Sequence, residues 1–109
     1  MRFYCTDDTV DLEQYPYHVR DVHISDPFIL ADPKSRCYYT YVQFADTERF
    51  PDVETDKEHG VFYVLESKDL IHWSKPQICF RQNNFWADKD YWAPEVHIWK
   101  GRYYLFSSF

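Results

Sequence analysis

Two segments of this chain carry apolar or aromatic side chains on both of their faces, and this limits the folds open to it. The stretch 61–65, Val-Phe-Tyr-Val-Leu, is apolar throughout. Along the stretch 37–44, one face holds Cys37, Tyr39, Tyr41 and Gln43, and the other holds Tyr38, Thr40, Val42 and Phe44. An antiparallel sheet with one solvated face would alternate apolar and polar residues. We therefore expect sheets covered on both sides, as in stacked propeller blades or the central strands of some sandwiches.

The rest of the chain reads as short strands separated by turns. β-forming residues predict further strands at 28–31, 77–80, 95–99 and 102–106. Residues 32–36 read as a turn, with Pro33 suited to its second position, and 67–73 as a turn or irregular crossing. Lys100-Gly101 is a two-residue hairpin signal, since glycine readily takes a positive φ. No window of about 11 residues has a helical period, so the predicted class is all-β.

Composition narrows the function classes. Aromatic residues make up 21% of the chain, which suits tightly packed sheets or a ligand surface built of rings. The formal net charge of -6 disfavours nucleic-acid binding, because phosphate contacts need a basic face. The acidic excess lies mainly in 6–21 and 46–58, which read as solvated loops. Neither stretch has the spacing of a calcium-binding loop.

The cysteines and the N-terminal residues indicate the cellular compartment of the protein. Cys5, Cys37 and Cys79 are too few and too widely spaced for a disulfide framework or a zinc cluster, so free thiols are expected. Charged residues interrupt the first 25 residues, so no secretory signal is readable. No apolar run reaches the length of a membrane span. These observations predict a cytoplasmic protein with no membrane partner.

A faint repeat relates two parts of the chain. A carboxylate, Asp26 or Glu95, comes just before or at the start of an apolar run, and a turn and a Tyr-Tyr strand follow each time. The Tyr pairs begin at Tyr38 and Tyr103, which are 65 positions apart. Repeats of this kind suggest a radial or stacked architecture. Because the leading strand of each propeller blade lines the central channel, both carboxylates are expected to point into one funnel.

Three motifs then occur in a recognisable order. They are Asp-Pro-Phe-Ile-Leu at 26–30, Ser-Lys-Asp-Leu-Ile-His-Trp at 67–73 and Tyr-Trp-Ala-Pro-Glu-Val at 91–96. Together they resemble the start of a family 43 glycoside hydrolase, over about residues 20–109. The resemblance implies a partial five-bladed β-propeller of about one and a half blades. It also implies an arabinofuranosidase or xylosidase type of enzyme that inverts anomeric configuration in glycans containing arabinose or xylose.

The same resemblance assigns roles to two carboxylates. Asp26 matches the general base of the family, and Glu95 matches a third carboxylate that tunes and positions the acid. That third position is more often Asp in the family, and Glu is longer by one methylene. Inversion needs a base and an acid roughly 6.5–9.5 Å apart, so that a water fits between base and sugar. A third carboxylate raises the pKa of the acid by like-charge repulsion.

Other side chains have competing roles. Trp86 and Trp92 are candidate substrate-binding residues, because aromatic faces suit the C–H surfaces of sugars, although core packing explains them equally well. His97 shares a strand face with Glu95 and could approach the site, although a structural role is favoured. Leu70 and Trp73 are expected to close a blade by packing. The remaining histidines lack ligand spacing, so no metal site or cofactor is expected; they are His18, His23, His59 and His72.

The general acid of the family is a Glu well downstream of the Trp-Ala-Pro motif, and no Asp or Glu follows Glu95 here. We therefore expect a lead-in segment, 1–25, and an incomplete propeller domain, 26–109, that is inactive alone. A non-catalytic carbohydrate-binding module and an interaction fragment remain alternatives. In the latter, exposed aromatic sheet edges would pair with another chain.

Overall fold

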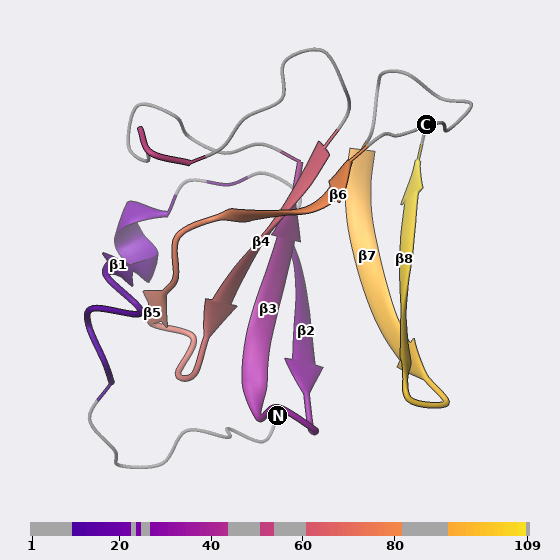
Figure 1. Cartoon of the computed structure of the whole chain (residues 1–109), viewed down its shortest axis with the longest axis horizontal. Coiled ribbons are helices and arrows are strands. Elements are labelled where there is room, and N and C mark those ends of the chain that lie inside the picture. The colour runs from indigo at the N-terminus through magenta and orange to yellow at the C-terminus, as the bar shows by residue number, and fades with distance from the viewer. Residues whose placement is uncertain are drawn as a thin grey trace.

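The computed structural model describes residues 10–22, 24, 27–43, 51–53, 61–81 and 92–108. These residues form two antiparallel sheets and a single turn of 3-10 helix, Val19–Asp21 (Figure 1). The prediction of an all-β chain is confirmed for this part of the molecule. Among the described residues, no helix has the length and apolar composition that crossing a bilayer requires.

The first sheet contains six strands, and three of them form its centre. β2 (Phe28–Asp32), β3 (Cys37–Val42) and β4 (Val61–Ser67) are antiparallel neighbours. Two further strands pair with β4: β5 (His72–Trp73) and β6 (Gln77–Arg81). β1 (Tyr17–His18) pairs with β5 at the outer edge. The sequence indicates neither β1 nor β5, because two residues are too few to show an alternating pattern.

The second sheet is the hairpin of β7 (Trp92–Trp99) and β8 (Arg102–Ser108). Lys100 and Gly101 join the strands with φ values of 49° and 74°. Two consecutive positive φ values match the twist of the flanking strands, which confirms the turn expected at this dipeptide. Figure 1 shows β7 beside β2, with both strands running in the same direction, and β8 on the far side of β7.

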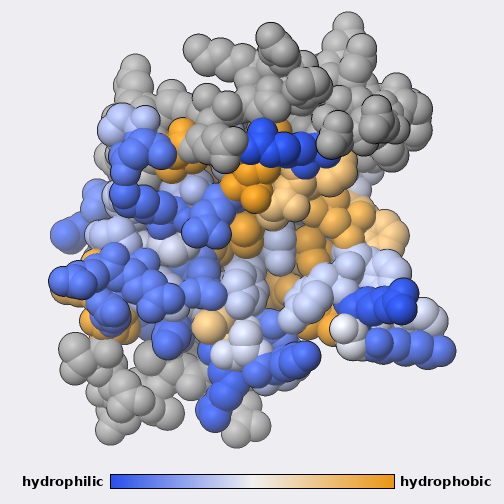
Figure 2. Space-filling view, in the orientation of Figure 1, coloured by the Kyte–Doolittle hydropathy of each residue, from blue (hydrophilic) through white to orange (hydrophobic). Residues whose placement is uncertain are grey.

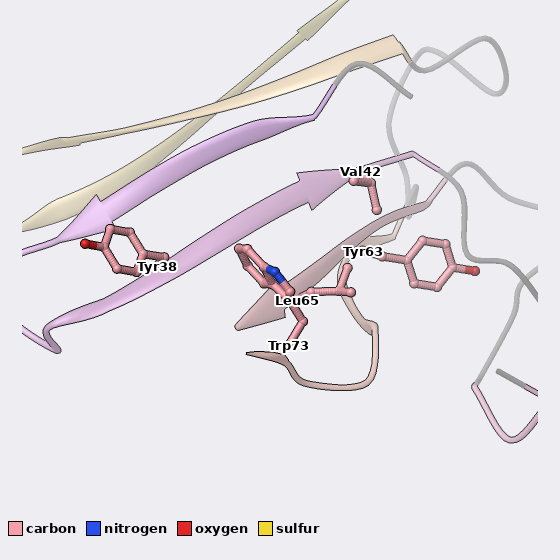
Figure 3. Close-up of a cluster of buried hydrophobic side chains, with 5 residues drawn as sticks. All are labelled: Tyr38, Val42, Tyr63, Leu65 and Trp73. Atoms are coloured by element: carbon pink, nitrogen blue, oxygen red, sulfur yellow. The ribbon is translucent and has the colours of Figure 1, made fainter. Parts of the chain in front are cut away.

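Both faces of the first sheet are covered, although unequally. One face holds a cluster of five buried residues, shown in Figure 3: Tyr38, Val42, Tyr63, Leu65 and Trp73. On the opposite face, Phe62 is fully buried against Phe80 and against Leu105 of β8. On that same face, Tyr39 and Tyr41 are only half-buried. The hairpin therefore supplies part of the second cover that the two-faced strands require.

The Ser-Lys-Asp-Leu-Ile-His-Trp motif forms the turn that returns the chain from β4 to β5. Ser67 Oγ accepts hydrogen bonds from the backbone N–H groups of Asp69 and Leu70. Asp69 Oδ1 accepts bonds from the N–H groups of Ile71 and His72, each at 2.8 Å. Trp73 is buried, and Leu70 packs against its cluster. Packing of these two residues at the end of the sheet is thus confirmed.

Candidate functional site

The outward face of the hairpin forms a groove of about 700 Å³. Its lining residues alternate along the two paired strands: Glu95, His97, Trp99, Tyr104 and Phe106. Register places Glu95 opposite Phe106 and His97 opposite Tyr104. Figure 2 shows hydrophobic residues gathered over the region of β7 and β8, while the side of β1 and β5 is mostly hydrophilic. Of the five lining residues three are aromatic, one is an acid and one is a histidine, so the groove is largely aromatic.

A β-bulge at the start of β7 sets which residues face this groove. The pairing register shifts between Trp92 and Glu95, and Ala93 takes a positive φ of 47°. Gln43 Oε1 holds the bulge by accepting the N–H of Ala93 at 3.0 Å. Beyond the bulge, Pro94 and Val96 are buried while Glu95 is exposed. A bulge re-aims the side chains that follow it, and here it directs the acid of the Trp-Ala-Pro-Glu-Val motif outward.

Glu95 and His97 form a pair in the groove, because residues two apart on a strand share a face. Glu95 Oε1 and His97 Nε2 are 2.7 Å apart. The side chains are 53% and 54% exposed in this chain, respectively. The His97 ring also lies 5.4 Å from the ring of Phe28 and 6.0 Å from that of Phe106, centroid to centroid. The prediction that His97 shares the face of Glu95 is confirmed.

The contact of Phe28 with His97 joins the two leading strands. Phe28 is the first residue of β2, and its ring reaches across to β7. The beginning of β2 therefore lies next to the Glu95–His97 pair, as the expectation of a shared funnel requires. Asp26, the candidate base just before this strand, lies outside the described residues, as does Trp86. Their predicted roles, like the boundary predicted between 25 and 26, stay predictions.

Trp92 begins β7 and is 48% exposed, but it does not line the groove. Its carbonyl oxygen accepts a hydrogen bond from Ser107 Oγ at 2.8 Å, which ties it to β8. The exposed ring leaves room for stacking on a sugar, so the substrate-binding role stays a prediction. Sequence reasoning missed Trp99, Tyr104 and Phe106 as groove residues. Their alternation, read together with the hairpin register, is the signal that could have found them.

The described residues contain no group of three or more His, Cys, Asp or Glu placed to hold a metal ion. Cys37 and Cys79 are free thiols, in line with the expectation for these two positions. Cys5 lies outside the described part of the chain.

Comparison with known proteins decides the family. Residues 18–109 match the family model described as glycosyl hydrolases family 43. The chain belongs to this family. A solved structure, the endo-arabinase from Bacteroides thetaiotaomicron VPI-5482, is similar to it with a TM-score of 0.68 and 32% sequence identity. The match covers 87% of this chain and 29% of that chain. No curated protein sequence matches this chain significantly.

The two sheets of this family 43 chain correspond to neighbouring blades of a propeller. The first sheet is one blade of a β-propeller, and β7 and β8 are the first strands of the next blade. The prediction of a partial propeller of about one and a half blades is confirmed. Apart from β1, which pairs at the outer edge of the first sheet, β2 and β7 are the first strands of their blades. This explains why they run side by side in the same direction (Figure 1).

Proposed function

We propose that this chain is the start of a glycosidase domain that hydrolyses arabinofuranosyl linkages in arabinose-containing glycans by inversion. Membership of family 43 supports glycoside hydrolysis, and the similar structure, an endo-arabinase, favours arabinose over xylose. The observation that carries the proposal is the placement of Glu95. The leading strand of the second blade presents this acid in an open aromatic groove, beside the beginning of the leading strand of the first blade.

The proposed division of labour follows from the chemistry of inversion. Asp26 would be the general base that deprotonates the attacking water, and a separate acid would protonate the leaving oxygen. Glu95 would sit near that acid and raise its pKa by like-charge repulsion, which keeps it protonated until it reacts. Trp86 and Trp92 would offer ring faces to the sugar.

We further propose that residues 1–109 are inactive alone and that the remaining blades supply the acid. Three facts support this proposal. The chain spans 29% of the endo-arabinase chain, no Asp or Glu follows Glu95, and the second blade has two described strands. A propeller closes with four to eight blades. Both the pocket and its protonation chemistry would therefore depend on blades that residues 1–109 do not supply.

The test compares residues 1–109 with a longer polypeptide that continues them through the remaining blades. Both would be assayed on arabinan, on aryl arabinofuranosides and on aryl xylosides. We expect turnover of the arabinose substrates by the longer polypeptide alone, and loss of most of it in Asp26→Asn without loss of folding. Turnover by the 109-residue chain that Asp26→Ala abolishes would contradict the proposed inactivity. Near-normal turnover in the longer Asp26→Asn variant would show that Asp26 is not the base.

The same samples separate the alternatives. Turnover of xylosides but not of arabinofuranosides would reassign the substrate. Calorimetric binding of arabino-oligosaccharides by residues 1–109, with no turnover by either polypeptide, would favour a non-catalytic carbohydrate-binding module. A defined oligomer in size-exclusion chromatography, with neither turnover nor binding, would favour an interaction fragment whose exposed strands pair with another chain.

A further inference from the structure

The Glu95–His97 pair differs from an ordinary surface ion pair in how its histidine is held. Exposed pairs of charged side chains contribute little, partly because fixing two long side chains costs conformational entropy. Here the imidazole contacts the ring of Phe28 of β2 and the ring of Phe106 of β8, at centroid distances of 5.4 and 6.0 Å. Two strands other than its own, β2 and β8, thus restrict the His97 ring. Less conformational entropy is therefore lost when the ring pairs with Glu95.

The proton of this pair can be placed by elimination. At 2.7 Å one of the two atoms must donate a hydrogen bond. An ionised carboxylate only accepts, so Nε2 of His97 carries the hydrogen when Glu95 is charged. This bond uses Oε1. Among the described residues, Oε2 of Glu95 has no hydrogen-bond partner, and the carboxylate lines the groove. One oxygen is anchored while the other is available to a substrate or to a neighbouring acid.

A second histidine–carboxylate pair in the chain shows what a purely structural version looks like. His72 Nδ1 and Asp69 Oδ2 are also 2.7 Å apart. There, however, Asp69 Oδ1 accepts two backbone N–H groups of its own turn, and the pair joins the β4–β5 turn to the first residue of β5, away from the groove. The Asp69 carboxylate thus stabilises its own turn. The Glu95 carboxylate makes no backbone hydrogen bond among the described residues and is anchored by His97.

We propose that His97 is a positioning residue that fixes the Glu95 carboxylate for the reaction. This inference rests on the proposed function, because it gives Glu95 a task in the groove. The Nε2–H of His97 selects one rotamer of a side chain that would otherwise sample several in solvent. The hydrogen bond from His97 would then affect kcat more than KM. A Glu95 carboxylate that samples several rotamers would misplace the charge that the transition state requires.

The experiment uses three variants in the longer polypeptide defined above, with arabino-oligosaccharide as substrate. His97→Phe keeps a ring beside Phe28 and Phe106 but removes the hydrogen-bond donor. His97→Gln restores an N–H donor at a comparable reach without the ring. His72→Phe is the matched control, because it breaks a histidine–carboxylate bond of the same length outside the groove. Circular dichroism monitors folding. Long-range proton–nitrogen NMR reports whether Nε2 carries the hydrogen, and Glu95→Gln tests whether that signal depends on Glu95.

We expect His97→Phe to lower kcat at least tenfold with KM within about threefold, and His97→Gln to recover most of that loss. The control should retain parental kcat. The Nε2 signal of His97 should shift in Glu95→Gln. An active parent whose kcat is unchanged in His97→Phe, or is lowered equally in His97→Gln, would overturn the inference and leave the proposed function standing. An inactive parent would overturn both. If His97→Phe fails to fold, a signal unaffected by Glu95→Gln would still refute the bond.

Discussion

Tyr103 Oη donates a hydrogen bond to Asp32 Oδ2 at 2.6 Å, and this bond joins the two sheets across a sequence separation of 71 residues. Asp32 is 2% exposed, although it is an acid. Its carboxylate also accepts the N–H of Lys34 at 2.9 Å and the hydroxyl of Ser35 at 3.0 Å. One buried carboxylate therefore shapes the β2–β3 turn and fastens the second blade to the first.

The first prediction concerns acid stability. Burial alone would raise the pKa of Asp32, but hydrogen bonds from Tyr103, Lys34 and Ser35 outweigh it and hold the pKa below its usual value of 3.8. A carboxyl whose pKa is lowered by folding stabilises the folded state above its unfolded pKa. That stability is lost as pH falls below about 3.8 toward the folded value. Urea unfolding of the unsubstituted chain across this pH range should show a falling free energy of unfolding.

Tyr103→Phe provides the comparison for this bond. It removes the strongest donor to Asp32 and keeps the ring. We expect a lower free energy of unfolding at neutral pH and a smaller decline of that free energy on acidification, because the folded pKa of Asp32 moves back toward the unfolded value. Tyr104→Phe, on the other face of β8, is the control. An identical pH dependence in Tyr103→Phe and the parent would show that the bond does not operate in solution.

The second prediction concerns Thr40, which lies in β3 and is 2% exposed. Among the described residues its Oγ1 has no hydrogen-bond partner. Thr40→Val replaces the hydroxyl by a methyl group of similar size, so the free energy of unfolding should be unchanged or higher by up to about 1 kcal/mol. Thr40→Ala is the control and should lower it, because a cavity remains. A marked loss in Thr40→Val would reveal a partner for the hydroxyl.

Some features of the fold and of the groove could be predicted from the sequence, and others could not. The aromatic strands and the turn at Lys100-Gly101 were predictable, because local side-chain types and backbone conformation determine them. The bond between Asp32 and Tyr103 was not, since no local signal relates residues in different blades. Only part of the lining of the groove was predictable. Glu95 and His97 share a strand, whereas Tyr104 joins them through the register that the turn and the bulge impose.

The third prediction concerns the hairpin turn. Gly101 has a φ of 74°, and a Cβ placed on it would meet nothing within 4 Å. Gly101→Ala should therefore act through backbone strain alone and lower the free energy of unfolding by about 1–2 kcal/mol. Gly101→Asn should cost less, because Asn tolerates this conformation. Thermal and urea unfolding would measure both. Equal losses in the two variants would contradict a strain-based explanation.

The last prediction concerns Glu95 in the longer polypeptide. If Glu95 raises the pKa of the general acid by repulsion, Glu95→Gln removes that charge and the pKa of the acid falls. The acid must be protonated to react, so the alkaline limb of the pH profile of kcat should move to lower pH while the acidic limb, which reports the base, stays in place. Glu95→Asp keeps the charge and should keep most of the parental profile. An unchanged alkaline limb with a raised KM would instead make Glu95 a residue that binds substrate.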